Sequence, residues 1–146
     1  MEKPIKSLIN QFNIRVYGLW VKDNALLILK EPYAGDILYK FPGGGIEYGE
    51  GLIEALQREL KEELNLELSS YEHFYTQEDF VQSKFREHEQ ILTIYYKIEI
   101  ENPKRIEILE KRIQKLIWVP LDRLNIHDVN LPVDRIVVNK LIQEIK

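Results

Sequence analysis

The sequence predicts an α/β protein in which helices cover a mixed central sheet. Three features support this prediction: segments of alternating or continuous apolar residues typical of strands, two amphipathic segments typical of helices, and the order in which they occur. Strands are expected before, between and after the helices, whereas a repeating strand–helix–strand protein would alternate the two. We therefore expect an α/β/α sandwich.

The expected strands differ in their apolar pattern. In residues 12–21 and 91–101 every second residue is apolar or glycine, which predicts one face packed on a core. Residues 25–29 (ALLIL) form a continuous apolar run, typical of a strand buried on both faces, and the Asp23-Asn24 pair before it predicts a turn. The other expected strands are residues 37–41, 71–81 and 113–119, with loops at residues 32–36 and 82–90.

Two amphipathic helices are expected, at residues 52–64 and 132–145. In the first helix, an apolar stripe about 80° wide is predicted at roughly 100° per residue; it consists of Ile53, Leu56, Leu60 and Leu64. Three acids, Glu59, Glu62 and Glu63, form a second arc of about 100° beside this stripe. The far side, expected to face solvent, carries Glu54, Gln57 and Lys61.

The three acids and the glycines ahead of them suggest a metal site. Like charges at this spacing cost about 0.2–0.5 kcal/mol per pair, and a solvated acidic face is the ordinary explanation. However, five of the seven glycines lie in the loop expected ahead of this helix, at residues 43–51, where they permit close backbone approach and leave carbonyl oxygens uncovered. Carboxylates with free carbonyls form a hard-oxygen site that suits Mg²⁺ or Mn²⁺, the ions used on phosphate esters and anhydrides.

Residues 44–66 resemble the Nudix box of the MutT-like hydrolases. The matching positions, separated by five, seven, one and one residues, are Gly44, Glu50, Arg58-Glu59-Leu60, Glu62-Glu63 and Asn65-Leu66. Only Asn65 departs from the family pattern, which has glycine there, and asparagine tolerates the left-handed conformation expected at that helix end. The resemblance implies one Nudix hydrolase domain over residues 1–146, a Nudix α/β/α sandwich.

The resemblance also implies a role for each acid of the box. Glu59, Glu62 and Glu63 would bind the catalytic Mg²⁺ or Mn²⁺, with Glu63 in direct contact, and the carbonyl of Gly43 would be a further ligand. Glu50 would reach the metal through water or pair with Arg58, and Arg58 would orient the acids through ion pairs.

The general base is expected from the box or from the later loop at residues 82–90. In that loop Glu87 and Glu89 are the candidates, and a solvated hairpin tip is the alternative explanation. His88 alone is more often a surface histidine than a base.

The implied reaction is hydrolysis of a nucleoside diphosphate linked to another group X. Water, activated by the metal and a carboxylate, would attack phosphorus in line. Accessory motifs of the ADP-ribose, coenzyme A and diadenosine-polyphosphate subfamilies are missing, which leaves a nucleoside triphosphate or a nucleotide-sugar as the expected substrate. A non-catalytic nucleotide sensor is the alternative, but sensors tend to lose box acids and here all are present.

Substrate contacts outside the box are weakly indicated. Phosphates could be contacted by Arg15, Lys30 and Lys40, and a base could stack on Tyr17, Trp20, Phe80 or Phe85. For each of these side chains, core packing or plain surface charge is the more ordinary role.

Composition excludes several other classes of protein. With 45% hydrophobic and 30% charged residues, a chain of 146 residues should form one folded domain. A net charge of −4 argues against bulk nucleic-acid binding, and the absence of cysteine excludes disulfides and thiolate chemistry. No signal-peptide core or apolar span of about 20 residues is present, so we expect a cytoplasmic protein with no membrane contact. The sequence leaves undecided whether the chain forms a homodimer.

Overall fold

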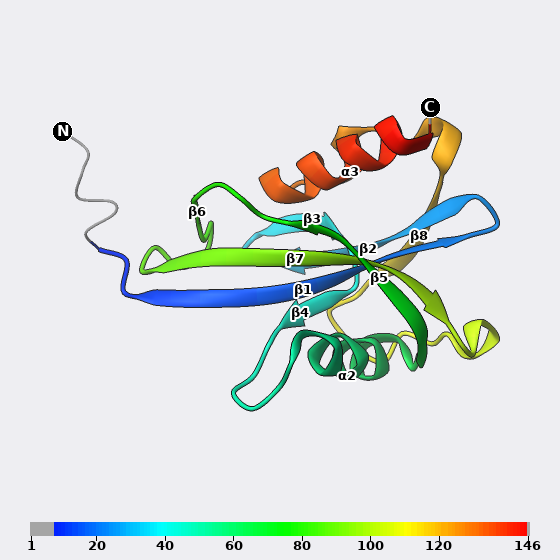
Figure 1. Ribbon diagram of the computed structural model, residues 1–146, viewed down its shortest axis with the longest axis horizontal. Helices are drawn as coiled ribbons and strands as arrows, with labels where there is room; N and C mark the ends of the chain where they lie inside the picture. The colour runs from blue at the N-terminus through cyan, green and yellow to red at the C-terminus, as the bar shows by residue number, and fades with distance from the viewer. Residues whose placement is uncertain (1–7, 146) are drawn as a thin grey trace.

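Two helices pack on opposite faces of a mixed sheet, which gives the expected α/β/α sandwich (Figure 1). The computed structural model describes residues 8–145. The strands are β1 (Gln11–Lys22), β2 (Ala25–Tyr33), β3 (Asp36–Lys40), β4 (Gly43–Gly45), β5 (Leu68–Thr76), β6 (Val81–Gln82), β7 (Glu89–Ile100) and β8 (Lys115–Pro120). The helices are α2 (Leu52–Leu64) and α3 (Pro132–Ile145), with three short 3-10 turns at Pro103–Arg105, Leu121–Arg123 and Ile126–Asp128.

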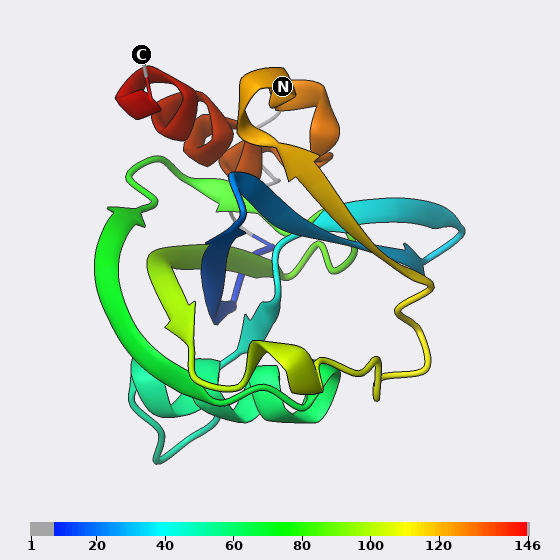
Figure 2. The same ribbon diagram turned by 90° about the vertical axis from the view of Figure 1, so that its right-hand side faces the viewer.

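The sheet is mixed because β1 and β7 run parallel, from Gln11 beside Glu89 to Trp20 beside Ile98, while the other pairs are antiparallel. Its order is β3-β2-β1-β7-β5, and β4, β6 and β8 pair with β1, β7 and β2. The β1–β2 pair is short, reaching only from Lys22–Ala25 to Val21–Leu26. Beyond this pair β2, β3 and β8 separate from β1 (Figure 2). Residues of β1 and of the β2–β3 hairpin line a cleft there.

Side chains of the central strands alternate between the two faces of the sheet, so the strands contribute to two hydrophobic cores, one beneath each helix. On β1, Val16 and Trp20 pack with the α2 core, whereas Tyr17 and Leu19 pack with the α3 core. The apolar run of β2 divides in the same way, with Leu27 and Leu29 on the α2 side and Leu26 and Ile28 on the α3 side. The predicted two-sided burial of this run is confirmed, and the prediction that β1 buries one face was too narrow.

Helix α2 has the predicted bounds and the predicted end. Asn65 lies in the left-handed region, with φ 60° and ψ 37°, and its backbone N–H reaches the carbonyls of Leu60 and Lys61. The prediction for Gln57 was wrong: its side chain donates to the Leu66 carbonyl and accepts from the Leu68 N–H, so it joins α2 to β5 instead of facing solvent. A long amide side chain beside a strand start can bond to free backbone groups there.

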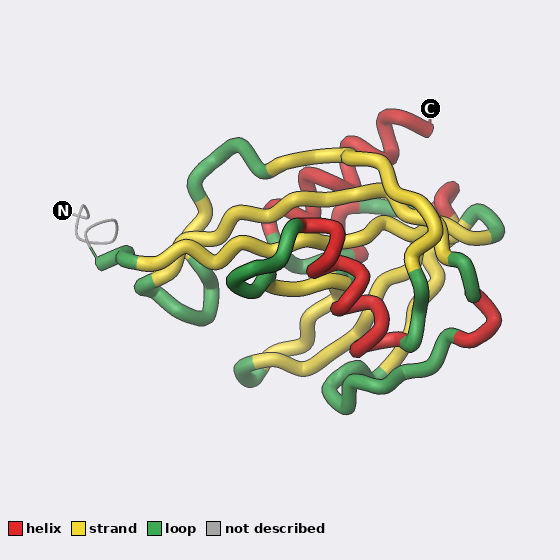
Figure 3. The backbone as a smooth tube through the Cα atoms, turned by 60° about the horizontal axis from the view of Figure 1, so that its bottom comes forward, coloured by secondary structure: helices red, strands yellow, loops and turns green. Residues whose placement is uncertain are grey.

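Several strand boundaries differ from the sequence prediction. Residues 43–45, expected as a loop, form the short strand β4, one of the yellow segments of Figure 3. A backbone without side chains fits there against β1. Strand β2 continues through Pro32, which lies beyond Lys30, the last β2 residue paired with β8, so the missing N–H costs no ladder bond there.

The strand expected at residues 71–81 is divided into β5 and β6. The break falls at Gln77, whose buried side chain donates to the carbonyls of Asp79 and Ile91 and accepts from the backbone and hydroxyl of Thr93. One amide side chain therefore satisfies backbone groups that a continuous strand would otherwise pair.

No helix within residues 8–145 is long and apolar enough to cross a membrane. The expectation that the chain starts without a signal peptide concerns mainly residues 1–7, which lie outside the described residues.

A buried hydrogen bond connects α3 to the sheet. Asp134, in the first turn of α3, is 3% exposed, and its Oδ1 accepts the Tyr95 hydroxyl at 2.6 Å. Burial raises the pKa of Asp134 to about 6 and holds the pKa of Tyr95 well above its ordinary value.

Asp134 should make stability depend on pH. Because the pKa of its carboxyl is higher in the folded state, its contribution to stability is complete below about pH 4 and is lost as pH rises through about 6. Asp134→Asn keeps the acceptor oxygen but cannot ionise. We expect the unfolding free energy of this variant, relative to wild type, to rise by up to about 3 kcal/mol between pH 4 and 7 in urea titrations. The exposed Asp122→Asn is the control, and a difference independent of pH would contradict the assignment.

Candidate active site

A cleft of about 570 Å³ lies where the β2–β3 strands separate from β1. Its walls come from segments far apart in the sequence: the first half of β1, the β2–β3 hairpin, β4, α2, the β6–β7 turn and the start of α3. The volume suits one small-molecule ligand. The cleft is therefore the candidate ligand site.

Two of the predicted carboxylates meet beside β4. Glu63 is 7% exposed, and its Oε1 accepts the Gly43 N–H at 3.1 Å. Burial raises the pKa of Glu63 to about 7 and also raises the pKa of Glu59 above its ordinary value. The Glu59 carboxylate lies so close over Gly44 that an added Cβ would be 2.5 Å from its Oε2. Glycine at this position is therefore what lets the helix place Glu59 against β4.

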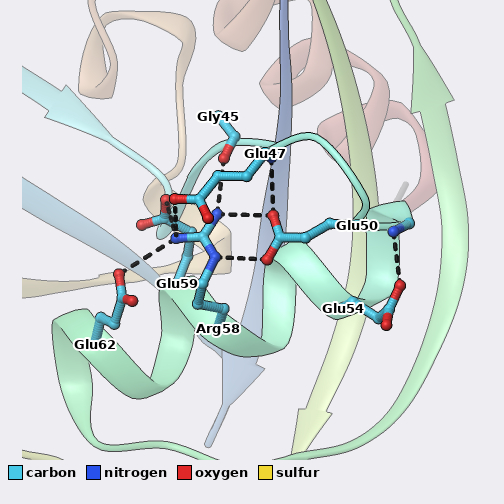
Figure 4. A network of polar contacts seen from close by, with 8 residues as sticks. Gly45, Glu47, Glu50, Glu54, Arg58, Glu59 and Glu62 are labelled. Carbon is cyan, nitrogen blue, oxygen red and sulfur yellow. Dashed lines mark hydrogen bonds and ion pairs between the residues drawn. The ribbon is translucent and has the colours of Figure 1, made fainter.

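Arg58 connects the loop after β4 to the acidic side of α2 (Figure 4). Its guanidinium donates from Nε to Glu50 at 2.6 Å, from Nη2 to the same carboxylate at 3.0 Å, and to the Gly45 carbonyl at 3.0 Å. Nη1 reaches Glu59 at 3.2 Å and Glu62 at 3.3 Å. These bonds to Arg58 lower the pKa of Glu50. Of the two arrangements expected for Glu50, the structure shows the ion pair with Arg58.

Glu62 lies apart from the other two box acids. Its side chain is 60% exposed and contacts the outer side of Arg58 (Figure 4). Within the part of the chain that the structure describes, no three acidic or histidine side chains come together closely enough to hold an ion alone. The structure therefore brings Glu59 and Glu63 together and leaves Glu62 at the rim.

Two predicted phosphate contacts lie inside the cleft. Lys40 is 7% exposed, 4.0 Å from a carboxylate oxygen of Glu31 and 5.7 Å from the centre of the Tyr17 ring. Burial disfavours the Lys40 ammonium, but Glu63, Tyr17 and Glu31 outweigh burial and raise the pKa of Lys40. Arg15 donates from Nε to the Tyr17 hydroxyl at 2.5 Å, and this tyrosine is the main cause of its raised pKa. Both cations thus remain charged in the cleft.

The remaining candidates divide between the cleft and other places. Glu89 lines the cleft, where its carboxylate accepts from Asn13 and pairs with Arg86. Phe85 and Tyr17 also line it. The candidates that do not line it are Lys30, Trp20, Phe80 and Glu87. Of these, Trp20 is a core residue packed edge-on against Trp118.

Sequence reasoning missed several cleft residues, including Glu31, Tyr33, Arg112 and Asp134. Glu31 and Tyr33 continue the alternation of β2 beyond Leu29, so extending the strand past Pro32 would have indicated them. Asp134 is a single acid on the buried side of α3, which is a recognisable signal. Arg112 comes from the irregular segment before β8, and nothing in the sequence pattern indicates it.

The donor set suits a hard divalent ion. Mg²⁺ commonly keeps several waters and takes only one or two protein carboxylates, with substrate phosphates completing its shell. Glu59, Glu63 and the backbone of β4 supply such oxygens, and the cleft lining includes no histidine. The residues therefore fit Mg²⁺ or Mn²⁺ and do not fit a zinc site.

Fold and cleft together define a sandwich protein whose glycine strand and acidic helix border a nucleotide-sized site. A family model described as the NUDIX domain matches residues 10–140. The chain belongs to the NUDIX family, which confirms the resemblance found at residues 44–66.

Solved structures agree with this fold. The solution structure of the E. coli ORF135 protein is 19% identical, with a TM-score of 0.75 over 91% of this chain and 90% of that one. The MutT NUDIX hydrolase from Burkholderia pseudomallei is 22% identical, with a TM-score of 0.72 over 89% and 98% of the two chains.

Two relatives match in sequence. Nucleoside triphosphatase NudI from Enterobacter sp. (strain 638) is 33% identical over 60% of this chain and 65% of its own length. The U8 snoRNA-decapping enzyme from Homalodisca vitripennis is 30% identical over 68% and 50%. The matches thus span about half to two thirds of these relatives.

Adjacent glycines offer a matched test of the carboxylate site. Gly44→Ala should displace the Glu59 carboxylate, because the new Cβ would be 2.5 Å from it. At Gly45 the same methyl group would meet only ordinary contacts, with Arg15 Nη1 nearest at 3.5 Å. We expect Gly44→Ala to weaken Mn²⁺ binding by about 10- to 100-fold with little loss of thermal stability, and Gly45→Ala to bind like wild type. Equal Mn²⁺ affinities by titration calorimetry would contradict the assignment.

Proposed function

We propose that this protein hydrolyses a phosphoanhydride bond in a nucleoside diphosphate derivative and that it requires Mg²⁺ or Mn²⁺. The observation that carries the proposal is the pairing of two largely buried carboxylates, Glu59 and Glu63, with two cations in one cleft, the buried Lys40 and the half-buried Arg15. Phosphoanhydride hydrolysis needs acidic side chains that hold a divalent ion and, beside them, cationic side chains that bind phosphate.

The cations define where the phosphate chain would lie. Lys40 and Arg15 face the same cleft as Glu63, and the pKa of each is raised, so both present positive charge to a phosphate oxygen. Arg15 is also held in place by the hydroxyl of Tyr17, so little side-chain freedom is lost when it binds. When bound, the divalent ion would neutralise charge on the phosphate oxygens and activate water.

The proton acceptor would come from one of two places in the cleft. One is the box, whose acids Glu59 and Glu63 both line the cleft. Glu89 is the acid of the later segment that faces the cleft, and its hydrogen bond with Asn13 fixes its orientation. Glu87 is exposed and does not line the cleft, so Glu89 is the stronger of the two candidates from that segment.

The nucleobase of the substrate would bind at the α3 end of the cleft. Leu131 and Val133 give this end apolar walls, and Asp134 and Tyr95 form its polar pair. A buried carboxyl beside apolar side chains suits a flat, mainly apolar ring that carries an N–H donor. A nucleoside triphosphate is the substrate that we favour, and the name of the relative NudI, a nucleoside triphosphatase, supports this choice.

A substrate panel tests the proposal. Purified protein is incubated with nucleoside triphosphates, nucleotide-sugars and dinucleotides in Mg²⁺, and released phosphate and nucleotide are measured. We expect hydrolysis of at least one triphosphate, complete loss of activity with excess EDTA, and recovery on adding Mg²⁺. Binding without turnover across the panel would instead favour a nucleotide sensor.

Glu63→Gln should abolish most activity without unfolding the protein. The amide keeps an oxygen that can accept the Gly43 N–H, but it lacks the charge that would hold the ion. We expect kcat to fall by at least about 100-fold while the melting temperature stays close to that of wild type. Glu54→Gln, an exposed change on the same helix, is the control and should leave kcat unchanged. Near-normal kcat in Glu63→Gln would move the ion site elsewhere.

A further inference from the structure

Two aromatic rings meet across the cleft. Tyr33, at the end of β2, and Phe85, in the β6–β7 turn, stack with their centroids 4.2 Å apart and their planes 6° apart. Both side chains line the cleft, and both are half-buried. The turn before β3 and the turn after β6 lie at the same end of the sheet (Figure 1). The stack therefore joins the two walls of the cleft at that end.

An ion pair accompanies the stack. Lys84 Nζ is 3.4 Å from Asp36 Oδ2, and the same ammonium lies 5.8 Å from the centre of the Phe85 ring. Both partners are more than half exposed. We call Tyr33, Phe85, Asp36 and Lys84 the aromatic bridge. It links the β2–β3 hairpin with the β6–β7 turn through two independent contacts.

Three cations lie at or near the bridge, and each is paired with an acid of its own. Lys84 belongs to the bridge and Arg86 follows Phe85. The hydrogen bond with Glu110 is the main cause of the raised pKa of Arg112, and Tyr33 lies near enough to add to it. The α3 end carries the apolar walls and the Tyr95–Asp134 pair instead. A nucleotide bound in this cleft would therefore place its base at the α3 end and the far end of its phosphate chain toward the bridge.

We propose that the aromatic bridge selects substrates by the size of the group beyond the phosphates, so that nucleoside triphosphates are accepted and nucleotide-sugars and dinucleotides are disfavoured. This inference rests on the proposed function. A terminal phosphate adds little bulk and meets the cations near the bridge. A sugar or a second nucleoside in the same place would have to separate Tyr33 from Phe85 before it could bind.

The cost of separating the rings sets the expected size of the effect. A bulky substrate loses at most the free energy of the bridge, and an aromatic pair corresponds to a factor of roughly two to ten in an equilibrium constant. The bridge therefore biases the choice of substrate and does not exclude larger ones. Removal of either ring should abolish the whole bias, because one ring alone cannot stack.

The test compares kcat/KM for UTP and for UDP-glucose in wild type, Tyr33→Ala, Phe85→Ala and the double variant. We expect the UDP-glucose to UTP ratio to rise roughly two- to tenfold in each single variant and no further in the double variant. Tyr33→Phe keeps the ring and should behave as wild type. Tyr71→Ala removes an exposed tyrosine outside the cleft and should leave the ratio unchanged.

Other outcomes would overturn the inference. A higher KM for UTP in the alanine variants would show that the rings stack on the base, and additive single effects would show that they act separately. Binding of both compounds is measured in parallel by calorimetry with Ca²⁺. Hydrolysis with an unchanged ratio in every variant would refute the bridge but not the hydrolase. A shifted binding ratio without any hydrolysis would refute the hydrolase but not the bridge.

Discussion

The structure depends on the close contact of the glycine strand β4 with both β1 and α2. A Cβ on Gly43 would lie 2.1 Å from the Val16 carbonyl oxygen, and a Cβ on Gly44 would lie 2.5 Å from Glu59. The same three residues therefore pair with the sheet on one side and approach the carboxylates of the helix on the other. Because side chains would separate these layers, the position of Glu59 and Glu63 follows from the absence of side chains in β4.

Charge around α2 is balanced locally. Arg58 contacts the carboxylates of Glu50, Glu59 and Glu62 and fixes the loop through the Gly45 carbonyl. One guanidinium with donors in several directions can serve this number of acceptors, whereas a lysine ammonium has only three donors on a single atom. Glu63 lies beyond its reach and instead has Lys40 as its cationic neighbour. The acids thus have two separate sources of positive charge, one at the rim and one inside the cleft.

The sequence predicted what periodicity and local chemistry determine. Both helices have the predicted bounds, Asn65 adopts the left-handed conformation, and the burial of ALLIL on both faces follows from a continuous apolar run. Features set by packing between distant segments were not predicted. Gln57 and Gln77 find backbone partners brought to them by other strands, and Tyr33 and Phe85 become neighbours only when two turns meet. No local sequence pattern predicts these contacts, because each residue is compatible with the structure of its own segment and its partner lies far away in the sequence.

The burial of Glu63 links the stability of the protein to the ion that it is proposed to hold. Without an ion, burial raises the pKa of Glu63 to about 7. Near neutral pH the protonated and the charged forms of this carboxyl are therefore both populated. Lys40 favours the charged form but cannot by itself outweigh burial. A divalent ion would favour the carboxylate strongly and release the proton, so ion binding should become tighter as pH rises through this range. In this arrangement Lys40 would keep the carboxylate partly ionised before an ion binds, and the ion would supply the positive charge that the cleft residues lack.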